Sequence, residues 1–234
     1  MSFKIAFDSD GLIVQTDGDG GDCAARTGEL YTLLAVRERM GISNADWPTP
    51  QPFLNALDKL APGGILVRYP RPENGYNNPS DTTRDQTMPM IIASAYTQNE
   101  MFAIRQAEEL DNHFDTFPNG DPAGPAEWGI IDRCRNDMTW LIYLGDLQLI
   151  FSVLTRCFIG LIPSNVGDDI NLTLYLLCTM DFRPTWLSKI AVFLYRKLRP
   201  RGVQYAFDVY HSPESHANPL NELARPVIAA RLSR

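Results

Sequence analysis

Three polar stretches of the sequence carry side chains that could exchange protons or bind a polar ligand. They are residues 17–23, residues 77–86 and residues 210–219, and each adjoins a segment that we expect to be helical. Carboxylates, imidazoles, amides and a guanidinium in one hollow are the groups that general acid–base catalysis uses. We therefore expect the three stretches to meet at one end of a helical array and to form a single site.

The stretch 77–86 ends in Arg84, Asp85 and Gln86, directly before an apolar segment. A guanidinium and a carboxylate at the start of a helix can hold a diol or a carboxylate through paired, charge-assisted hydrogen bonds. Asp81 and Gln86 add further hydrogen-bonding side chains beside this pair. The alternative is that Arg84 and Asp85 form an ordinary ion pair at the start of the helix.

This junction, a polar loop followed by Arg84-Asp85 and a long apolar helix, resembles the substrate-facing junction of six-hairpin (α/α-toroid) glycosidases. In glucoamylase-like members an Arg-Asp pair grips sugar hydroxyls, so the resemblance implies that Arg84 and Asp85 hold a sugar. Thr82-Thr83 stands where the family has an aromatic residue, and the chain is short for six full hairpins. The resemblance therefore implies an incomplete toroid. The chain also resembles bacterial and phage proteins of unassigned function, which adds no chemistry.

The stretch 210–219 places Glu214 between His211 and His216, with Asn218 shortly after them. Apolar walls around Glu214 would raise its pKa toward neutrality, as a proton donor needs. His211, His216 and Asn218 would then contact the substrate. The alternative is a capped turn before the last helix.

Five aspartates and four glycines lie between positions 8 and 22. Oxygen-rich loops bent by glycine suit calcium, and Asp17, Asp19 and Asp22 are the candidate ligands. The spacing does not fit an EF-hand, because Gly28 stands where the final glutamate ligand belongs. Two other interpretations stay open: Asp22 caps the following helix, or Asp22 or Asp19 activates a water molecule.

Cys23 stands at the expected N-terminus of a helix, where the helix dipole would lower the pKa of its thiol. A cysteine nucleophile also needs a base. His211 or His216 could supply it, with Asn218 as the residue that orients the imidazole, an order similar to that of papain-like enzymes. The alternative is a packed, unreactive cysteine.

The composition limits the classes of function. With 44% hydrophobic residues the chain can bury one good-sized core, and we expect residues 1–234 to form a single domain. The formal charge of -7 disfavours a nucleic-acid partner. The four cysteines include no C-x-x-C pair, which argues against structural zinc, so calcium is the one cofactor to consider. We see no signal peptide and expect a cytoplasmic protein, or one exported by a route that the sequence does not reveal.

The pattern predicts a mainly α fold, an array of helical hairpins in an incomplete α/α toroid, with a short N-terminal β-hairpin from residues 3–7 and 12–16. A further strand-like segment covers residues 65–69. Asp146 and Arg156 interrupt the apolar segment 140–162, so we expect a buried core helix pair there and no membrane span. The predicted helices are residues 23–40, 53–60, 83–96, 99–113, 126–134, 138–161, 168–180, 185–198 and 219–232.

These features favour a glycan-active hydrolase or lyase with an oligosaccharide or polysaccharide substrate. Asp85 and Arg84 would hold the sugar, Glu214 would donate the proton, and Asp22 or Asp19 would activate water. Tyr76 and Trp128 would offer flat faces for sugar rings. Two alternatives from other classes stay open: a non-catalytic binding or assembly module, and a cysteine hydrolase built on Cys23 with His211 or His216.

Overall fold

The computed structural model describes residues 7–9, 12–13, 22–47, 50–71, 75, 77–135, 139–158, 166–198 and 218–232. These residues are mainly helical, as predicted, and none of them belongs to a β-strand. Two short 3-10 turns, η2 (Pro62–Gly64) and η4 (Pro79–Asp81), lie between α2 and α3. The α-helices are α1 (Cys23–Arg39), α2 (Pro50–Leu60), α3 (Arg84–Tyr96), α4 (Glu100–Asn112), α5 (Pro125–Cys134), α6 (Thr139–Phe158), α7 (Val166–Asp181), α8 (Trp186–Leu198) and α10 (Asn218–Arg231).

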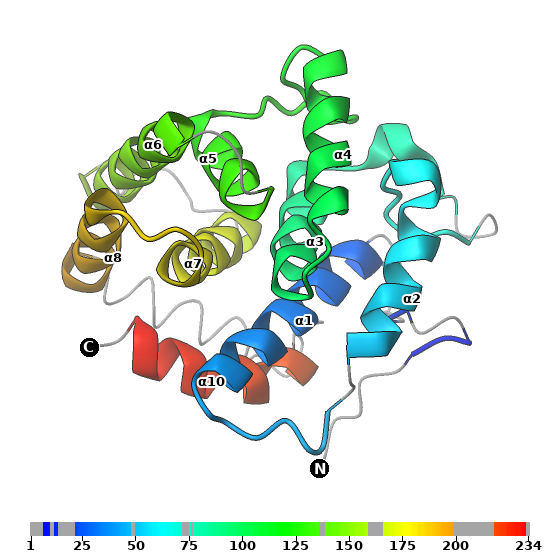
Figure 1. The fold of residues 1–234 in the computed structure, drawn as a ribbon, viewed down its shortest axis with the longest axis horizontal. Coiled ribbons are helices and arrows are strands. Elements are labelled where there is room, and N and C mark those ends of the chain that lie inside the picture. Colours follow the sequence, from blue (N-terminus) through cyan, green and yellow to red (C-terminus); the bar gives the residue numbers. More distant parts are fainter. Residues whose placement is uncertain are drawn as a thin grey trace.

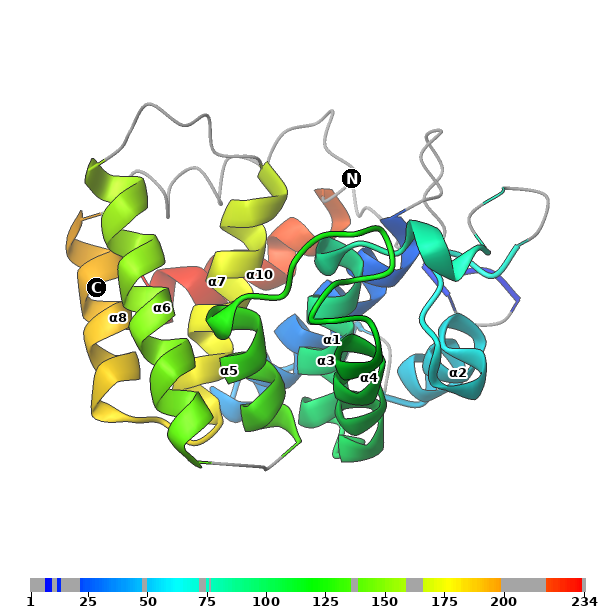
Figure 2. The same ribbon diagram turned by 90° about the horizontal axis from the view of Figure 1, so that it is seen from above.

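Helices α3 to α8 lie roughly alongside one another, and α1 and α10 run across them (Figures 1 and 2). Helix α3 is at the centre, in contact with α1, α4, α5 and α7. Helices α6 and α8 pack together at the end of the molecule farthest from α2 (Figure 2). The C-terminal end of α7 is tied to two other helices, because Asp181 accepts hydrogen bonds from Tyr96 of α3 at 2.6 Å and from Arg231 of α10 at 2.7 Å.

Helices α1 and α3 cross at backbone contact. A Cβ at Gly28 of α1 would lie 2.4 Å from the carbonyl carbon of Pro89 in α3. No side chain larger than hydrogen fits there unless the two backbones separate. Pro89 lies inside α3 and is buried at this crossing. The crossing fixes where the N-terminal ends of the two helices lie relative to each other.

A second glycine contact joins α5 to α6. A Cβ at Gly145 would lie 2.3 Å from the Cα of Gly129, so these two backbones also touch. Beside this contact, Arg133 of α5 and Asp146 of α6 form a completely buried ion pair. Thr185, directly before α8, donates a further hydrogen bond to Asp146. Together these contacts fix the rotation of α6 about its own axis.

One sequence prediction is tested only in part, and two differ from the structure. At the N-terminus, Phe7 and Ile13 form an isolated antiparallel bridge, and the rest of the predicted hairpin lies outside the described residues. Residues 65–69 form no helix, and none of the described residues pairs with them as a strand; the Val67 N–H donates instead to the Leu60 carbonyl at 2.7 Å. The segment 140–162 was expected to form a buried core helix pair. Its described part belongs to α6, which leaves one apolar face exposed, so the expected burial is wrong. Within the described residues no helix is long and apolar enough to span a bilayer.

Candidate functional site at the N-terminal ends of α1 and α3

Side chains and backbone from elsewhere in the chain cap the N-terminus of α1. The Ala25 N–H donates to Oε1 of Gln86 at 3.0 Å, and the Ala24 N–H donates to the Arg68 carbonyl at 3.1 Å. Asp22 occupies the N-cap position, as predicted, but its side chain makes no capping hydrogen bond. The first turn of α1 is therefore satisfied by α3 and by the extended segment before it. The Asp22 carboxylate is left for other contacts.

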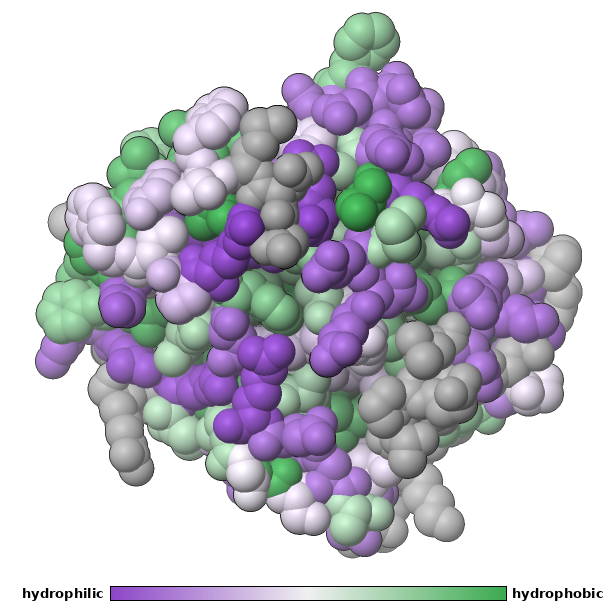
Figure 3. All heavy atoms as spheres, viewed as in Figure 1, coloured by the Kyte–Doolittle hydropathy of each residue, from purple (hydrophilic) through white to green (hydrophobic). Residues whose placement is uncertain are grey.

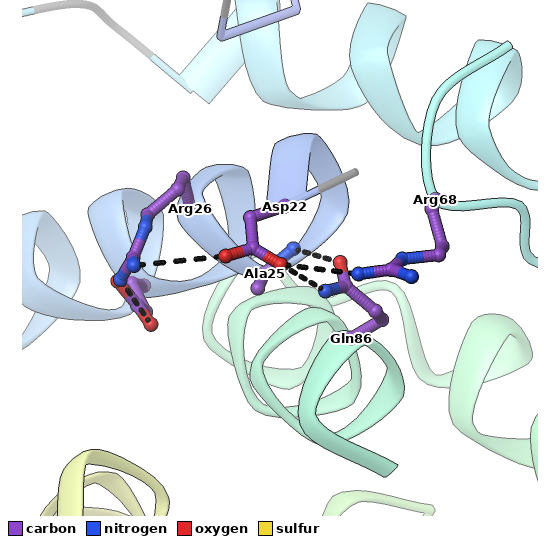
Figure 4. Close-up of polar contacts among 6 residues, drawn as sticks. Asp22, Ala25, Arg26, Arg68 and Gln86 are labelled. Carbon is purple, nitrogen blue, oxygen red and sulfur yellow. Dashed lines mark hydrogen bonds and ion pairs between the residues drawn. The ribbon is translucent and has the colours of Figure 1, made fainter. Parts of the chain in front are cut away.

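Three polar side chains hold the Asp22 carboxylate (Figure 4). Nε2 of Gln86 donates to its Oδ1 at 2.8 Å, and Nη2 of Arg68 lies 3.4 Å from the same oxygen. Nη2 of Arg26 lies 3.9 Å from Oδ2. The Asp22 side chain keeps 28% of its surface exposed. A carboxylate held from two sides and still open to solvent can accept a proton from water or from a ligand hydroxyl.

Glu29 extends this network into the interior. Both of its carboxylate oxygens accept hydrogen bonds from Nη1 of Arg26, at 2.9 and 3.1 Å. Burial raises the pKa of Glu29; Arg26 opposes this rise, and the neighbouring carboxylates Asp22 and Asp85 add to it. A buried carboxyl with a raised pKa beside carboxylates in other surroundings is the pattern of an acid–base pair. We call Asp22, Arg26, Glu29, Arg68 and Gln86 the Asp22 cluster.

Arg84 and Asp85, predicted to hold a sugar, stand in the first turn of α3 next to the cluster. Nε of Arg84 lies 3.7 Å from Oδ1 of Asp85, so the two form a loose ion pair. Nη1 of Arg84 also lies 3.9 Å from Glu127 of α5, whose other oxygen accepts the Gly124 N–H at 2.9 Å. Each side chain of the Arg84–Asp85 pair keeps about one third of its surface exposed. Both groups can therefore reach a ligand from solvent.

Sequence reasoning brought Asp22, Arg84, Asp85 and Gln86 to attention but missed three members of the cluster. Arg26 and Glu29 follow Asp22 at spacings of four and seven residues, which places all three on one face of a helix. That spacing was a readable signal for both residues. Arg68 carried no such spacing signal, because it stands in a segment that was expected to be a strand.

The other predicted site residues are not among the members of the Asp22 cluster, and several lie outside the described residues. Asp81 ends the η4 turn and is exposed, and Trp128 is half-buried on α5 with the Arg135 guanidinium 5.7 Å from its ring centre. Asn218 opens α10, but its side chain lies outside the described residues. Further predicted residues also lie outside them: Asp17, Asp19, Tyr76, His211, Glu214 and His216.

The expected calcium site has one ligand candidate in the described part of the chain, Asp22, and Gln86 and Arg68 already contact its carboxylate. Among the described residues, no three His, Cys, Asp or Glu side chains are grouped to hold a metal ion. The arrangement around Asp22 is thus one of a carboxylate paired with cations and an amide.

Cys23 was expected to have a lowered pKa, and the structure shows the opposite. Burial raises the pKa of the Cys23 thiol, and the nearby Asp8 carboxylate raises it further. The thiol is buried and donates a hydrogen bond to the Ile13 carbonyl at 2.9 Å. Desolvation of the thiolate outweighs the helix dipole here, because the side chain points into the core and away from solvent.

Comparisons with protein-family models, curated proteins and solved structures give no match to this chain. The chemistry of the site therefore has to be argued from its own geometry.

Proposed function

We propose that the chain is a glycan-active hydrolase or lyase that works by carboxylate acid–base catalysis at the Asp22 cluster. One observation carries the proposal: a solvent-accessible carboxylate, Asp22, lies in the same network as a buried carboxyl of raised pKa, Glu29. Enzymes that break glycosidic bonds use two carboxyl groups with different pKa values.

Asp22 is the base in this proposal. Gln86 and Arg68 hold its Oδ1, so the carboxylate has a fixed direction before substrate binds. Such positioning removes part of the entropic cost of proton transfer from a water molecule or from a carbon next to a carboxylate. Arg84 and Asp85, which directly precede Gln86 in the first turn of α3, supply a donor and an acceptor for adjacent sugar hydroxyls.

The proton donor has two candidates. The first is Glu214, predicted from the sequence, whose place relative to Asp22 is part of the proposal. The second is Glu29, whose raised pKa suits a proton donor but whose oxygens are bound by Arg26. An incomplete α/α toroid with the site at its mouth also belongs to the proposal. Hydrolysis with inversion would require the working carboxyls to lie about 6.5–9.5 Å apart, and retention about 5–5.5 Å.

The test is a panel of polysaccharides and oligosaccharides incubated with the full chain, with and without EDTA. New reducing ends report hydrolysis or elimination, and unsaturated products report elimination alone. We expect D22N to lose at least about 100-fold in kcat while its melting temperature stays within a few degrees. D58N, at an exposed position of α2, is the matched control and should act like the native chain.

The same panel separates the two proton donors. If Glu214 donates the proton, E214Q abolishes turnover and leaves substrate binding intact, whereas E29Q shifts the pH profile without abolishing turnover. The reverse result assigns the role to Glu29. A native chain that turns over no glycan in the panel, or a D22N variant with unchanged kcat, would contradict the proposal.

A further inference from the structure

The outward sides of α6 and α8 form a continuous apolar surface. Its residues stay 38–63% exposed and, apart from Leu198, recur at helical spacing: Trp140, Tyr143, Leu144, Leu147 and Phe151 on α6, and Trp186, Ile190, Phe193 and Leu198 on α8. We call this surface the α6/α8 face. Pale and green spheres gather over these two helices in Figure 3. Single exposed apolar residues are common, but a patch spanning two adjacent helices is not.

The exposure of this face is fixed by the fold. The opposite side of α6 is already packed, with Ile142, Leu149 and Val153 buried. The Gly129–Gly145 contact and the buried Arg133–Asp146 pair prevent α6 from rotating to bury its outer side. Within the described part of the chain, the outer side of α6 therefore stays in contact with solvent.

The composition of the face is that of an interface core. Helix α6 contains two charged residues, Asp146 and Arg156, and Asp146 is completely buried. Helix α8 carries three cations, Lys189, Arg196 and Lys197. Lys189 and Lys197 are exposed, and Lys197 follows Phe193 at a spacing of four residues, so it lies at the C-terminal end of the apolar stripe. Protein interfaces are rich in aromatic residues and poor in charge at their centre, with a polar rim around them.

The area of the face matches what a dimer needs. A fully exposed aromatic side chain presents on the order of 200 Å², so five aromatic residues at these exposures present about 500 Å². The four aliphatic residues bring the face to about 800 Å², the area that each partner buries in an interface of standard size. The largest apolar patch on a typical monomer is about 300–600 Å².

We propose that two copies of the chain associate through their α6/α8 faces to form a two-fold symmetric dimer. Helices α6 and α8 run in the same direction, since α7 reverses the chain between them (Figure 2). A two-fold axis that lies between the two faces, perpendicular to the helix axes, would lay the pair antiparallel on its copy and form a four-helix bundle. A net charge of -7 on the chain disfavours adsorption to an anionic membrane.

A hollow of about 310 Å³ between α7 and α8 adjoins the face at Phe193. Its lining is mixed, with apolar, hydroxyl and cationic side chains: Met180, Pro184, Val192 and Phe193, then Thr179 and Ser188, then Lys189 and Arg196. An aromatic side chain of the second copy has room to enter it. Aromatic anchors in such pockets contribute most of the binding energy of interfaces.

The test is analytical ultracentrifugation of the full chain between about 0.5 and 50 μM. We expect a dimer whose dissociation constant is micromolar or lower and changes little with salt, because its contact is apolar. L147E/F151E should weaken association by at least about 100-fold while the circular dichroism spectrum is retained. M101E, a similarly exposed position on α4, is the matched control and should leave the dimer intact.

Three outcomes would overturn the dimer proposal. The first is a native chain that is monomeric throughout this range. The second is a dimer that L147E/F151E leaves unchanged, which would place the contact elsewhere. The third is a monomer that binds phosphatidylcholine–phosphatidylserine vesicles and loses that binding in L147E/F151E, which would assign the face to a membrane surface. Glycan turnover is measured separately, so failure of either proposal leaves the other standing.

Discussion

Replacing Gln86 by alanine should lower the free energy of unfolding by about 2–4 kcal/mol, because this one buried side chain serves two partners. Its Oε1 accepts the Ala25 N–H of α1, and its Nε2 donates to the Asp22 carboxylate. The side chain is 2% exposed, so water does not take its place without entering the interior. The substitution should therefore separate the N-terminal ends of α1 and α3 as well as remove two hydrogen bonds.

The expected loss in the free energy of unfolding has two parts. The Ala25 N–H would be left without a partner in the first turn of α1, which costs about 1–3 kcal/mol. The hydrogen bond to Asp22 would contribute about 1.5–3 kcal/mol if fully buried, but the 28% exposure of the Asp22 side chain lets water replace part of it. For a chain of this size, each kcal/mol corresponds to about 2–4 °C in melting temperature, so we expect a loss of about 5–15 °C.

An isosteric variant sharpens the test. Q86E keeps an acceptor for Ala25 but turns a second oxygen toward Oδ1 of Asp22, so at neutral pH it should be at least as unstable as Q86A. In a D22N background, the new amide can donate to the new carboxylate, and the two changes together should recover at least about 1 kcal/mol relative to their sum. Q148A, at a half-buried position of α6, is the control.

Urea unfolding followed by circular dichroism gives these free energies. If Q86E is as stable as the native chain at pH 7, or if D22N and Q86E are simply additive, the Asp22–Gln86 contact does not hold the two helices together in solution.

Three further changes test other parts of the fold. Burial raises the pKa of Glu29 above its ordinary value of 4.5. The contribution of Glu29 to stability is therefore present below that pH and is lost as the pH rises. Urea unfolding from pH 4 to 8 should show the native chain losing stability relative to E29Q. G28A should cost at least about 3 kcal/mol, whereas G124A, whose Cβ would meet only the Glu127 carboxylate at 3.1 Å, should cost less than about 1 kcal/mol by the same assay. D146A should cost about 3–5 kcal/mol because it leaves the Arg133 guanidinium buried and unpaired, and thermal unfolding should show that R133L/D146L costs less than D146A alone.

The helices could be predicted from the sequence because each carries its own boundary signals. Helix α1 was expected over 23–40 and runs from Cys23 to Arg39, with Gly41 in a left-handed conformation just beyond its end. The segment 65–69 was mistaken for a strand, because an extended, β-branched run shows only that the backbone is extended. A strand also needs a partner, and the backbone hydrogen bonds of this segment go to Pro62, to the end of α2, to the Thr82 hydroxyl and to the N-terminus of α1.

The burial of α6 could not be read from its composition. A helix that is apolar on every side is normally buried, and this rule gave the wrong answer here. Ile142, Leu149 and Val153 are buried, whereas Trp140, Leu147 and Phe151 on other sides of the helix are exposed. Nothing in the sequence of α6 distinguishes the side that packs against α5 from the side that stays exposed.

From the sequence, the candidate site could be predicted only where its residues belong to a polar stretch next to a helix. Asp22 and Gln86 come from stretches that were expected to meet, and they lie in hydrogen-bond contact. The reason they meet is not polar. Gly28 and Pro89 bring the backbones of α1 and α3 together, six residues after Asp22 and three after Gln86. A helix rises about 1.5 Å per residue, so Asp22 and Gln86 lie only a short way along their helices from the Gly28–Pro89 contact. The contact therefore leaves the two N-terminal ends little freedom to move relative to each other. The position of the Asp22 carboxylate is therefore set by an apolar contact one to two helical turns away.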